Sequence, residues 1–428
     1  MDLSRLGFLL FMSAGLLFSA CKRDMFDAKV YNQILSEAST FSEIDPQHNW
    51  NLTESHATKV TVNADEAGNE SRVLILSGNP FIEDDHAEIL AETVCAKGQT
   101  VTLFYYAATC LRQFYAAVQT ADGRWLLKPF ATGQQSVDFA NDVTTVSGTP
   151  KEVYQTYTYC YEDTYPEPGD YDYNDLVLRI QKLPAQADNE IRLRVSLAAI
   201  GTLRQVAAAI RLTGYNYDDV ESVTTEEGRV FDPNYELSRY FIEESDLLIK
   251  GIHGEAVLNL FEDAHYAMYP AVNTWTDGTV GVVRRYYNTS QVSDGLTHRQ
   301  AKPKVLTYVV KLRNPRLLQN FTLEDIDPFV LKDYNSGKWE IHTFTHKAYQ
   351  TLHDLGSNET AYSNNMSWAL KIPNGTFRYP QEGACIGYYK DGVLTGAYMT
   401  LGHSFGQWVG SRLQSTDWYL YPSTGMVY

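Results

Sequence analysis

The sequence is short of positive charge and of cysteine, and each shortage excludes a class of protein. There are 35 Lys and Arg residues against 52 Asp and Glu, which gives a formal net charge of −17. So acidic a chain is a poor partner for nucleic acid or for an anionic membrane surface, and it suits divalent cations better. The five cysteines show no C-x-x-C spacing, so no zinc site is predicted.

Helical periodicity is also scarce, and regular alternation of strands and helices is absent, which disfavours a doubly wound fold. No fixed-period repeat or low-complexity tract is present. The chain is instead rich in aromatic residues, at 13% with 30 Tyr, and residues 191–197 alternate strictly between apolar and polar. We therefore predict an all-β protein with two β-sandwich-like domains and few short helices.

Residues 1–20 are predicted to be a lipoprotein signal peptide. Arg5 precedes the apolar run Leu6–Phe18, which is too short to span a bilayer comfortably. The run ends in Phe-Ser-Ala-Cys, which resembles a bacterial lipobox, so Cys21 is expected to carry the lipid and residues 21–45 to form a tether. The chain would then be an outer-membrane, surface-exposed lipoprotein that meets the membrane only through this anchor. The alternative is an ordinary secretory signal with a coincidental cysteine.

Residues 46–150 are predicted to form the N-terminal β-sandwich domain, and residues 151–428 the larger β-rich domain. In the first, residues 84–94 are expected to form one or two helical turns among strands. In the second, residues 191–197 and 206–212 are expected to pair as a hairpin through a turn at Gly201. Other expected strands are 59–62, 72–76, 101–106, 113–119, 125–127, 153–161, 176–180, 305–312 and 338–345.

Four cysteines remain after cleavage, and an even number permits disulfides in an exported protein. The sequence does not choose among the three possible connectivities. These cysteines are Cys95, Cys110, Cys160 and Cys385.

The densest group of oxygen ligands lies between two expected strands, at Asp170, Asp172, Asn174 and Asp175. Oxygen side chains at i, i+2 and i+4 can surround one Ca²⁺ when the backbone curls into a loop, whereas unneutralised carboxylates would repel one another. The sequence departs from an EF-hand loop, because Asp175 replaces the glycine and Gln181 the bidentate glutamate. Glu162 and Asp163 are candidate additional ligands. The alternative is a solvated turn whose side chains accept local backbone N–H groups.

This stretch resembles the LruC-domain family of bacterial envelope proteins. The resemblance begins with Glu162-Asp163 and Gly169–Val177, where GDYDYNDLV stands for the family's GDYDFNDLV. Further segments follow in the family's order at 255–265, 327–329, 340–342, 368–373, 379–382 and 417–419. The resemblance covers about residues 151–428 and implies a non-catalytic, Ca²⁺-assisted surface domain. The chain departs from the family at residues 343–346 and 401–405.

Catalytic patterns are weak. Residues 402–406 match G-x-S-x-G, but no histidine follows Ser404, so a hydrolase triad is not predicted. His342 and His346 are expected on one strand about 13 Å apart, too far for one zinc ion. His342 is therefore expected to be a hydrogen-bonded structural residue.

A second acidic group, Asn216, Asp218 and Asp219, fits either another cation site or an exposed turn. The sequence as a whole predicts a non-catalytic, Ca²⁺-binding surface lipoprotein that binds an extracellular protein or glycan ligand. A polysaccharide-binding module is the alternative, and a glycan hydrolase is a more distant one.

Overall fold

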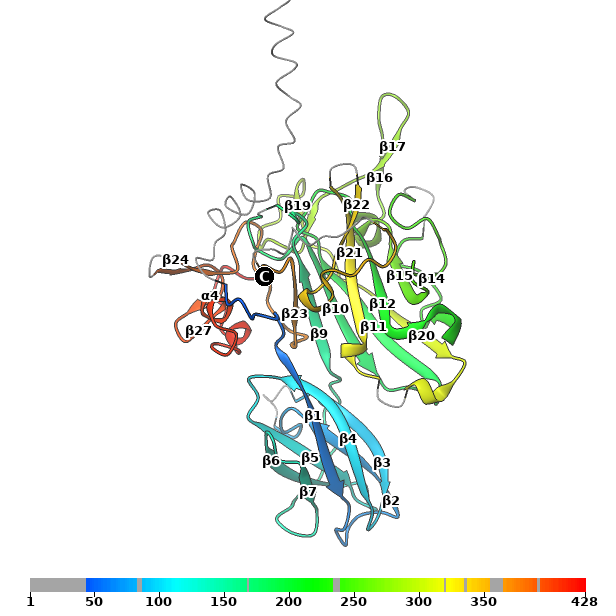
Figure 1. Ribbon diagram of the computed structural model, residues 1–428, viewed down its shortest axis with the longest axis vertical. Coiled ribbons are helices and arrows are strands. Elements are labelled where there is room, and N and C mark those ends of the chain that lie inside the picture. Colours follow the sequence, from blue (N-terminus) through cyan, green and yellow to red (C-terminus); the bar gives the residue numbers. More distant parts are fainter. Residues whose placement is uncertain are drawn as a thin grey trace, which may run out of the picture. The chain divides into compact units, whose positions relative to one another are not determined.

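The computed structural model describes residues 44–82, 87–167, 169–233, 239–318, 321–334, 337–354, 365–390 and 393–428. The expected signal peptide, Cys21 and nearly all of the expected tether lie outside these residues. Strands dominate, and the described ranges contain two α-helices, α3 (Ala264–Met268) and α4 (Phe405–Gly410) (Figure 1). The predicted all-β fold class is confirmed. The domain boundaries at residues 20, 45 and 150 stay predictions.

Residues 53–146 form two facing sheets. Their strands alternate between buried and exposed side chains, so each sheet has one apolar face. Val60, Phe114 and Leu126 lie in the core between them. One sheet has the order β4 (Thr100–Ala108), β1 (Thr53–Thr61), β7 (Ser136–Asp138). The other has the order β3 (Ile89–Ala96), β2 (Glu70–Leu76), β5 (Gln113–Gln119), β6 (Trp125–Ala131), β8 (Thr144–Val146).

The helical turns expected at 84–94 are wrong where the structure describes them. Residues 89–96 are strand β3, which pairs with β2 in the register Leu74↔Glu92. The strand partner satisfies the backbone of this segment, and tertiary pairing overrides its weak local preference.

A six-stranded and a five-stranded sheet make up most of the remaining chain. Two hydrogen bonds pass from one sheet to the other, from Tyr308 Oη to the carbonyl of Asn259 at 3.0 Å and from Tyr161 Oη to that of Pro328 at 2.7 Å. The first sheet has the order β13 (Val220–Thr225), β20 (Lys304–Leu312), β11 (Glu190–Ala199), β10 (Leu176–Leu183), β9 (Thr156–Tyr161), β23 (Ala369–Ile372). The second has the order β14 (Leu248–Lys250), β15 (Glu255–Phe261), β12 (Ala207–Asn216), β21 (Ile326–Tyr334), β22 (Gly337–Ile341).

Two expectations about these sheets are wrong. Strands β11 and β12 do not form a hairpin, because β11 belongs to the six-stranded sheet and β12 to the five-stranded one. The chain crosses between the sheets at residues 200–206. The strand expected at 338–345 ends at Ile341, and Phe344–His346 is a 3₁₀ turn. Alternation alone indicates a strand but not which sheet receives it.

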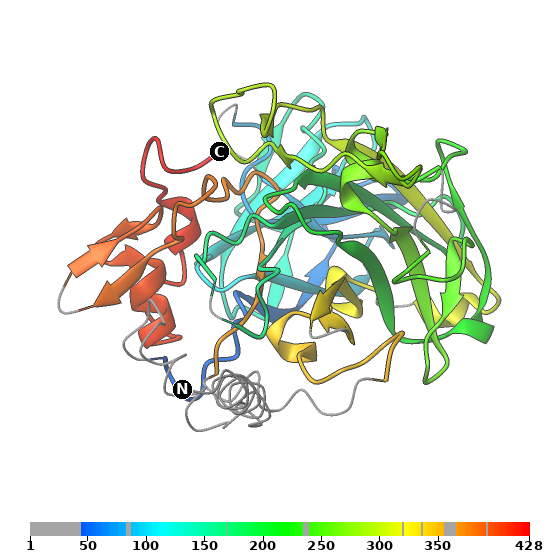
Figure 2. The ribbon, with the colours of Figure 1, turned by 90° about the horizontal axis from the view of Figure 1, so that it is seen from above.

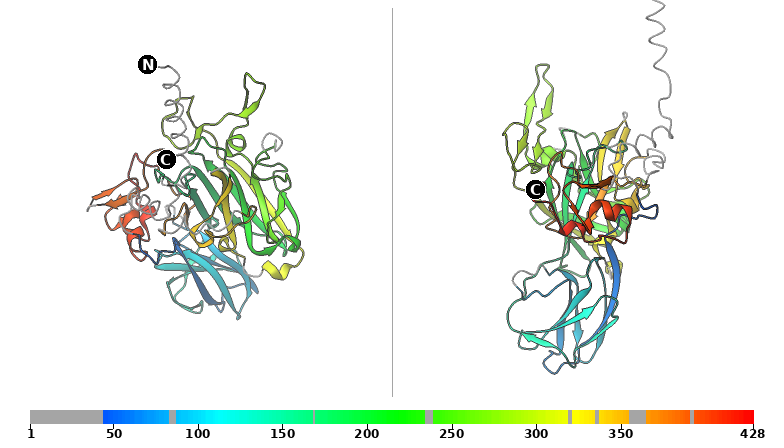
Figure 3. Two further views of the ribbon diagram at one scale, coloured as in Figure 1. Left: turned by 45° about the horizontal axis from the view of Figure 1, so that its top comes forward. Right: turned by 90° about the vertical axis from the view of Figure 1, so that its left-hand side faces the viewer.

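Smaller elements surround the sheets. The hairpin of β16 (Val272–Thr274) and β17 (Val280–Val282) projects from them (Figure 3). Toward the C-terminus, α4 lies with β24 (Tyr388–Lys390) and β25 (Val393–Thr395) beside the large sheets (Figure 2). Short pairs are β18 (Tyr286–Tyr287) with β19 (His298–Arg299) and β26 (Met399–Thr400) with β27 (His403–Ser404). Among the described residues, no helix has the length and apolarity needed to cross a membrane.

Candidate metal centre

The acidic loop connects two neighbouring antiparallel strands, β9 and β10, whose facing ends are Tyr161 and Leu176. Because the strands are paired, the two ends of the loop must meet. They are joined where the backbone N–H of Asp163 donates to Asp175 Oδ2 at 2.6 Å. The loop is therefore closed at the end of these two strands, which lie in the interior of the sheet.

Two tyrosines within the loop have a left-handed backbone. The φ angles are 55° at Tyr171 and 52° at Tyr173, which is uncommon for bulky residues and costs energy unless the surroundings hold it. Both side chains are buried. Tyr173 Oη donates to the carbonyl of Ser367 at 2.6 Å, and the carbonyl of Tyr171 accepts the N–H of Ile386 at 2.7 Å. These anchors fix a strained loop conformation, as is common at functional sites.

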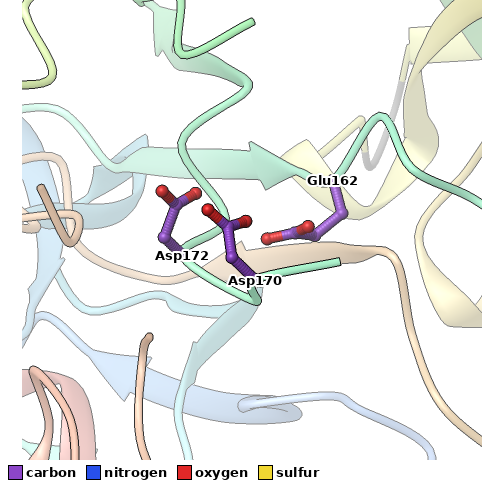
Figure 4. A group of neighbouring side chains, drawn as sticks. All are labelled: Glu162, Asp170 and Asp172. Atoms are coloured by element: carbon purple, nitrogen blue, oxygen red, sulfur yellow. The ribbon is translucent and has the colours of Figure 1, made fainter. Parts of the chain in front are cut away.

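The loop brings three carboxylates together. Glu162, Asp170 and Asp172 each offer one oxygen, and these three atoms lie within 4.8 Å of one another (Figure 4). Ca²⁺ binds oxygens at about 2.3–2.6 Å, so two ligands on opposite sides of one ion are about 5 Å apart. The three oxygens therefore fit around a single cation.

Glu162 is as deeply buried as Asp172, but only one of its two carboxylate oxygens has a hydrogen-bond partner among the described residues. Its side chain is 1% exposed, and Oε1 accepts the N–H of Tyr173 at 2.7 Å. Oε2 has no hydrogen-bond partner among the described residues. A Cβ on residue 169 would overlap Glu162 Oε2 and Thr164 Oγ1, so the glycine at this position leaves both oxygens room. A buried carboxylate oxygen without a donor is costly, and a bound cation removes that cost.

Burial is the largest cause of the raised pKa values of the three carboxylates, and neighbouring carboxylates add to it. Burial, and then the neighbouring Asp172 and Asp170 carboxylates, raise the pKa of Glu162 well above its usual value. Burial followed by Asp170 raises the pKa of Asp172 in the same way, and partial loss of water raises the pKa of Asp170. In the part of the chain that the structure describes, no basic side chain is among the largest influences on these three pKa values. Among the described residues, burial and neighbouring carboxylates are therefore the influences that raise these pKa values.

The other three predicted ligands have partners elsewhere. The carboxylate of Asp163 accepts from Thr202 Oγ1 and from Arg204 Nη1, the latter at 3.3 Å. Asp175 Oδ2 accepts the backbone N–H of Asp163, as described above. Asn174 Nδ2 donates to the carbonyl of Pro380 at 3.1 Å, whereas Asn174 Oδ1 is buried and has no hydrogen-bond partner among the described residues. The structure thus assembles Glu162, Asp170 and Asp172, while Asp163, Asn174 and Asp175 hold the loop to its surroundings.

A lysine near the loop does not neutralise the cluster. Lys332 Nζ donates to the backbone carbonyls of Asp163 and Tyr165, the second at 2.8 Å. Burial lowers the pKa of Lys332 to about 8 despite the nearby Asp163 carboxylate. Its ammonium group therefore holds the first turn of the loop through backbone carbonyls.

One carboxylate that interacts with the cluster, Glu382, is not among the ligands predicted from the sequence. Glu382 contributes to the raised pKa of Asp172, although it lies far along the chain in the C-terminal part. No local spacing connects it to the loop. The only signal was its position in the segment 379–382, which follows the family's order.

The second acidic group is an exposed turn. Asn216 precedes the 3₁₀ turn Tyr217–Asp219, and Asp219 Oδ2 accepts both the backbone N–H and Nδ2 of Asn216, at 2.9 and 3.1 Å. Asp218 is exposed and lies 3.9 Å from Lys250 Nζ. Local hydrogen bonds thus account for these residues.

The catalytic patterns occupy structural positions. Ser404 is fully buried and caps α4, where its Oγ accepts the N–H of Gln407 at 3.2 Å. His342 is also fully buried, with Nδ1 2.8 Å from Asp327 Oδ2 and Nε2 3.0 Å from Glu340 Oε2. The expectation that His342 is a hydrogen-bonded structural residue is confirmed.

Cys95, Cys110 and Cys160 are thiols and form no disulfide. Cys95 and Cys160 are buried, and burial raises the pKa of both thiols. These side chains pack as small apolar groups.

Comparison with known families gives one match over more than half of the chain. Residues 189–419 match the model of a family described as "Domain of unknown function (DUF4842)". The chain belongs to this family. The LruC-domain resemblance is not confirmed. The matched range of the DUF4842 family begins after the acidic loop and includes Glu382.

Other comparisons add little. No curated protein matches the chain. One solved structure, a "Putative lipoprotein from Bacteroides ovatus", shares 16% identity with a TM-score of 0.47, covering 83% of this chain and 98% of the other. At this level of similarity the match carries no inference about function.

Proposed function

We propose that this DUF4842 chain is a non-catalytic, Ca²⁺-binding lipoprotein of the bacterial surface, which binds an extracellular protein or glycan. Cys21 carries the lipid, and the protein meets the outer membrane only through that anchor. Glu162, Asp170 and Asp172 bind the cation, which acts as a structural ion and not as a reaction centre. DUF4842 membership itself assigns no activity.

The observation that carries the proposal is the buried Glu162 Oε2, which lacks a donor and belongs to a side chain grouped with two further carboxylates. A divalent cation satisfies this oxygen and neutralises the group at once. The donor set contains only carboxylate oxygens, with neither imidazole nor thiolate, and this favours a hard cation such as Ca²⁺. The ion would hold the strained loop closed and thereby stabilise the pairing of β9 with β10.

Calorimetric titration of the mature protein with Ca²⁺ tests the proposal. We expect saturable heat in the wild type, and none in Asp172→Asn, which keeps the side-chain shape but removes one charged ligand. Asp218→Asn is the matched control, because it removes an exposed carboxylate from the Asn216 turn and should leave the titration unchanged. Absence of heat in the wild type, together with an unchanged melting temperature, would sink the proposal.

A polysaccharide-binding module is the second candidate, favoured by a cavity of about 540 Å³. The cavity is lined by parts of β3, β4, β10 and β11 and by Tyr154 and Gln155, and Phe104 is one of its β4 residues. Phe104 is 56% exposed, and an exposed aromatic ring beside amide groups is a typical sugar platform.

Glycan-array screening of wild type and Phe104→Ala tests the polysaccharide-binding candidate. A glycan bound by the wild type and lost in the variant supports it, and a wild type that binds no glycan contradicts it.

A further inference from the structure

A C-terminal segment, residues 380–386, is held against the acidic loop by three hydrogen bonds. Asn174 Nδ2 donates to the Pro380 carbonyl at 3.1 Å, and the Gly383 N–H donates to Asp172 Oδ2 at 2.8 Å. The third bond is that of Ile386 to Tyr171, described above. The two chain segments are therefore in fixed register, although they are distant in sequence.

Glu382 lies in the middle of this segment. Its backbone N–H donates to the Thr289 carbonyl at 2.8 Å, which fixes the position of its Cα. Its Oε2 is buried and has no hydrogen-bond partner among the described residues. Burial, and then the carboxylate of Asp170, raise the pKa of Glu382 to about 7. Glu382 thus has, like Glu162, a buried carboxylate oxygen that lacks a donor, and it directly precedes Gly383, whose N–H is bonded to Asp172.

Docking this segment without a cation is electrostatically unfavourable. It brings a fourth carboxylate to three that already repel one another, and like charges at close range disfavour ionisation of the whole group. The three hydrogen bonds to the loop do not require an acid at position 382, since none of them uses its side chain. The Thr289 side chain lowers the pKa of Glu382 and so offsets part of this cost, and a cation between the two segments would offset the rest.

We propose that Glu382 is a fourth protein ligand of the cation, and that the ion fastens residues 380–428 to the loop between β9 and β10. This inference rests on the proposed Ca²⁺ site. The fastened region extends to the C-terminus, because Gln381 N–H donates to the Met426 carbonyl at 3.0 Å and Tyr428 N–H to that of Tyr379 at 2.9 Å. Cation binding would therefore order the C-terminal part together with the loop.

The test is Ca²⁺ titration of the mature chain and its Glu382→Gln variant at about 0.15 M and about 1 M salt, where the Debye length falls from about 8 Å to about 3 Å. Loss of a ligand should weaken the affinity at least about tenfold at both salt concentrations, since each 1.4 kcal/mol is a factor of ten. Glu221→Gln is the control, because Glu221 is exposed on β13. Its affinity should equal that of the wild type.

Hydrogen exchange provides a second readout, first in the wild type and then in the variant. Backbone amides of residues 381–386 should exchange more slowly with Ca²⁺ than with chelator, and this protection should be lost in Glu382→Gln. Wild-type exchange that Ca²⁺ leaves unchanged would overturn the inference.

The outcomes separate the two proposals. Equal affinity of wild type and Glu382→Gln, or a loss seen only at low salt, would overturn the role of Glu382 as a ligand and leave the Ca²⁺ site intact. If the wild type takes up no Ca²⁺, both proposals fail. A loss of affinity that persists at high salt, with loss of amide protection, supports the direct contact.

Discussion

Gly201 and Asn174 lie so close together that a side chain at position 201 has no room. A Cβ there would overlap Asn174 Oδ1 and lie 2.8 Å from the Asn174 carbonyl oxygen. Gly201 N–H also donates to the Asp175 carbonyl at 3.1 Å. The crossover from β11 to β12 is thereby packed directly onto the acidic loop, which joins the position of the cation site to the connection between the two large sheets.

Gly201→Ala should therefore destabilise the protein. The loop backbone would have to move away from residue 201, and overpacking of this kind costs about 1–3 kcal/mol. Urea unfolding measures the loss. Asn174→Ala in the same chain should restore only part of it, because the backbone oxygen of residue 174 remains in the way. A Gly201→Ala variant as stable as the wild type would show that the contact is easily relieved.

Glu162→Gln should have opposite effects with and without Ca²⁺. In chelator, it should raise the melting temperature, because the folded state disfavours the charged form of Glu162 and glutamine removes that charge. With Ca²⁺ at about a hundred times its dissociation constant, the wild type should gain about 2.7 kcal/mol and the variant far less. Differential scanning calorimetry measures both. A variant that is less stable than the wild type in chelator would contradict the electrostatic argument.

Stability should fall as the pH rises from about 6.5 to 9, because of His342. Burial alone lowers the pKa of this ring, but the Asp327 and Glu340 carboxylates raise it to about 9, above the ordinary 6.5. Because the pKa is higher in the folded state than in the unfolded state, protonated His342 stabilises the fold. This contribution to the free energy of unfolding is complete below about pH 6.5 and is lost as the pH rises through 9.

The expected slope for one such proton approaches 1.4 kcal/mol per pH unit. Urea unfolding of wild type and His342→Gln across this range measures the effect of the His342 proton on stability. The wild-type curve should fall more steeply. Parallel curves would mean that the His342 ring is neutral in the fold.

Cys21→Ser should release the protein from the membrane. The wild type should incorporate labelled palmitate and partition with the membrane fraction, because a diacylated N-terminus anchors stably. Cys110→Ser is the control, since it removes a thiol from the folded part and should leave labelling unchanged. Equal soluble fractions for wild type and Cys21→Ser would favour the ordinary secretory signal.

Local pattern predicted the strands well and their partners poorly. Residues 113–119 were expected as a strand from their aromatic and β-branched content, and β5 has these bounds. Residues 191–197 and 206–212 are likewise strands, but in different sheets. Alternation reports that one face is buried and says nothing about which neighbour buries it. Segment 84–94 failed for a related reason, because pairing with β2 decided the structure of its described part.

The sequence by itself determined that the chain is all-β and that acidic side chains gather between β9 and β10, because both properties depend on residues adjacent in the chain. Only the tertiary structure decided which of those side chains converge. The left-handed backbone at Tyr171 and Tyr173 gathers Glu162, Asp170 and Asp172, while Thr202 and Arg204 engage Asp163. The approach of Glu382 likewise depends on packing between distant segments, which no local spacing encodes.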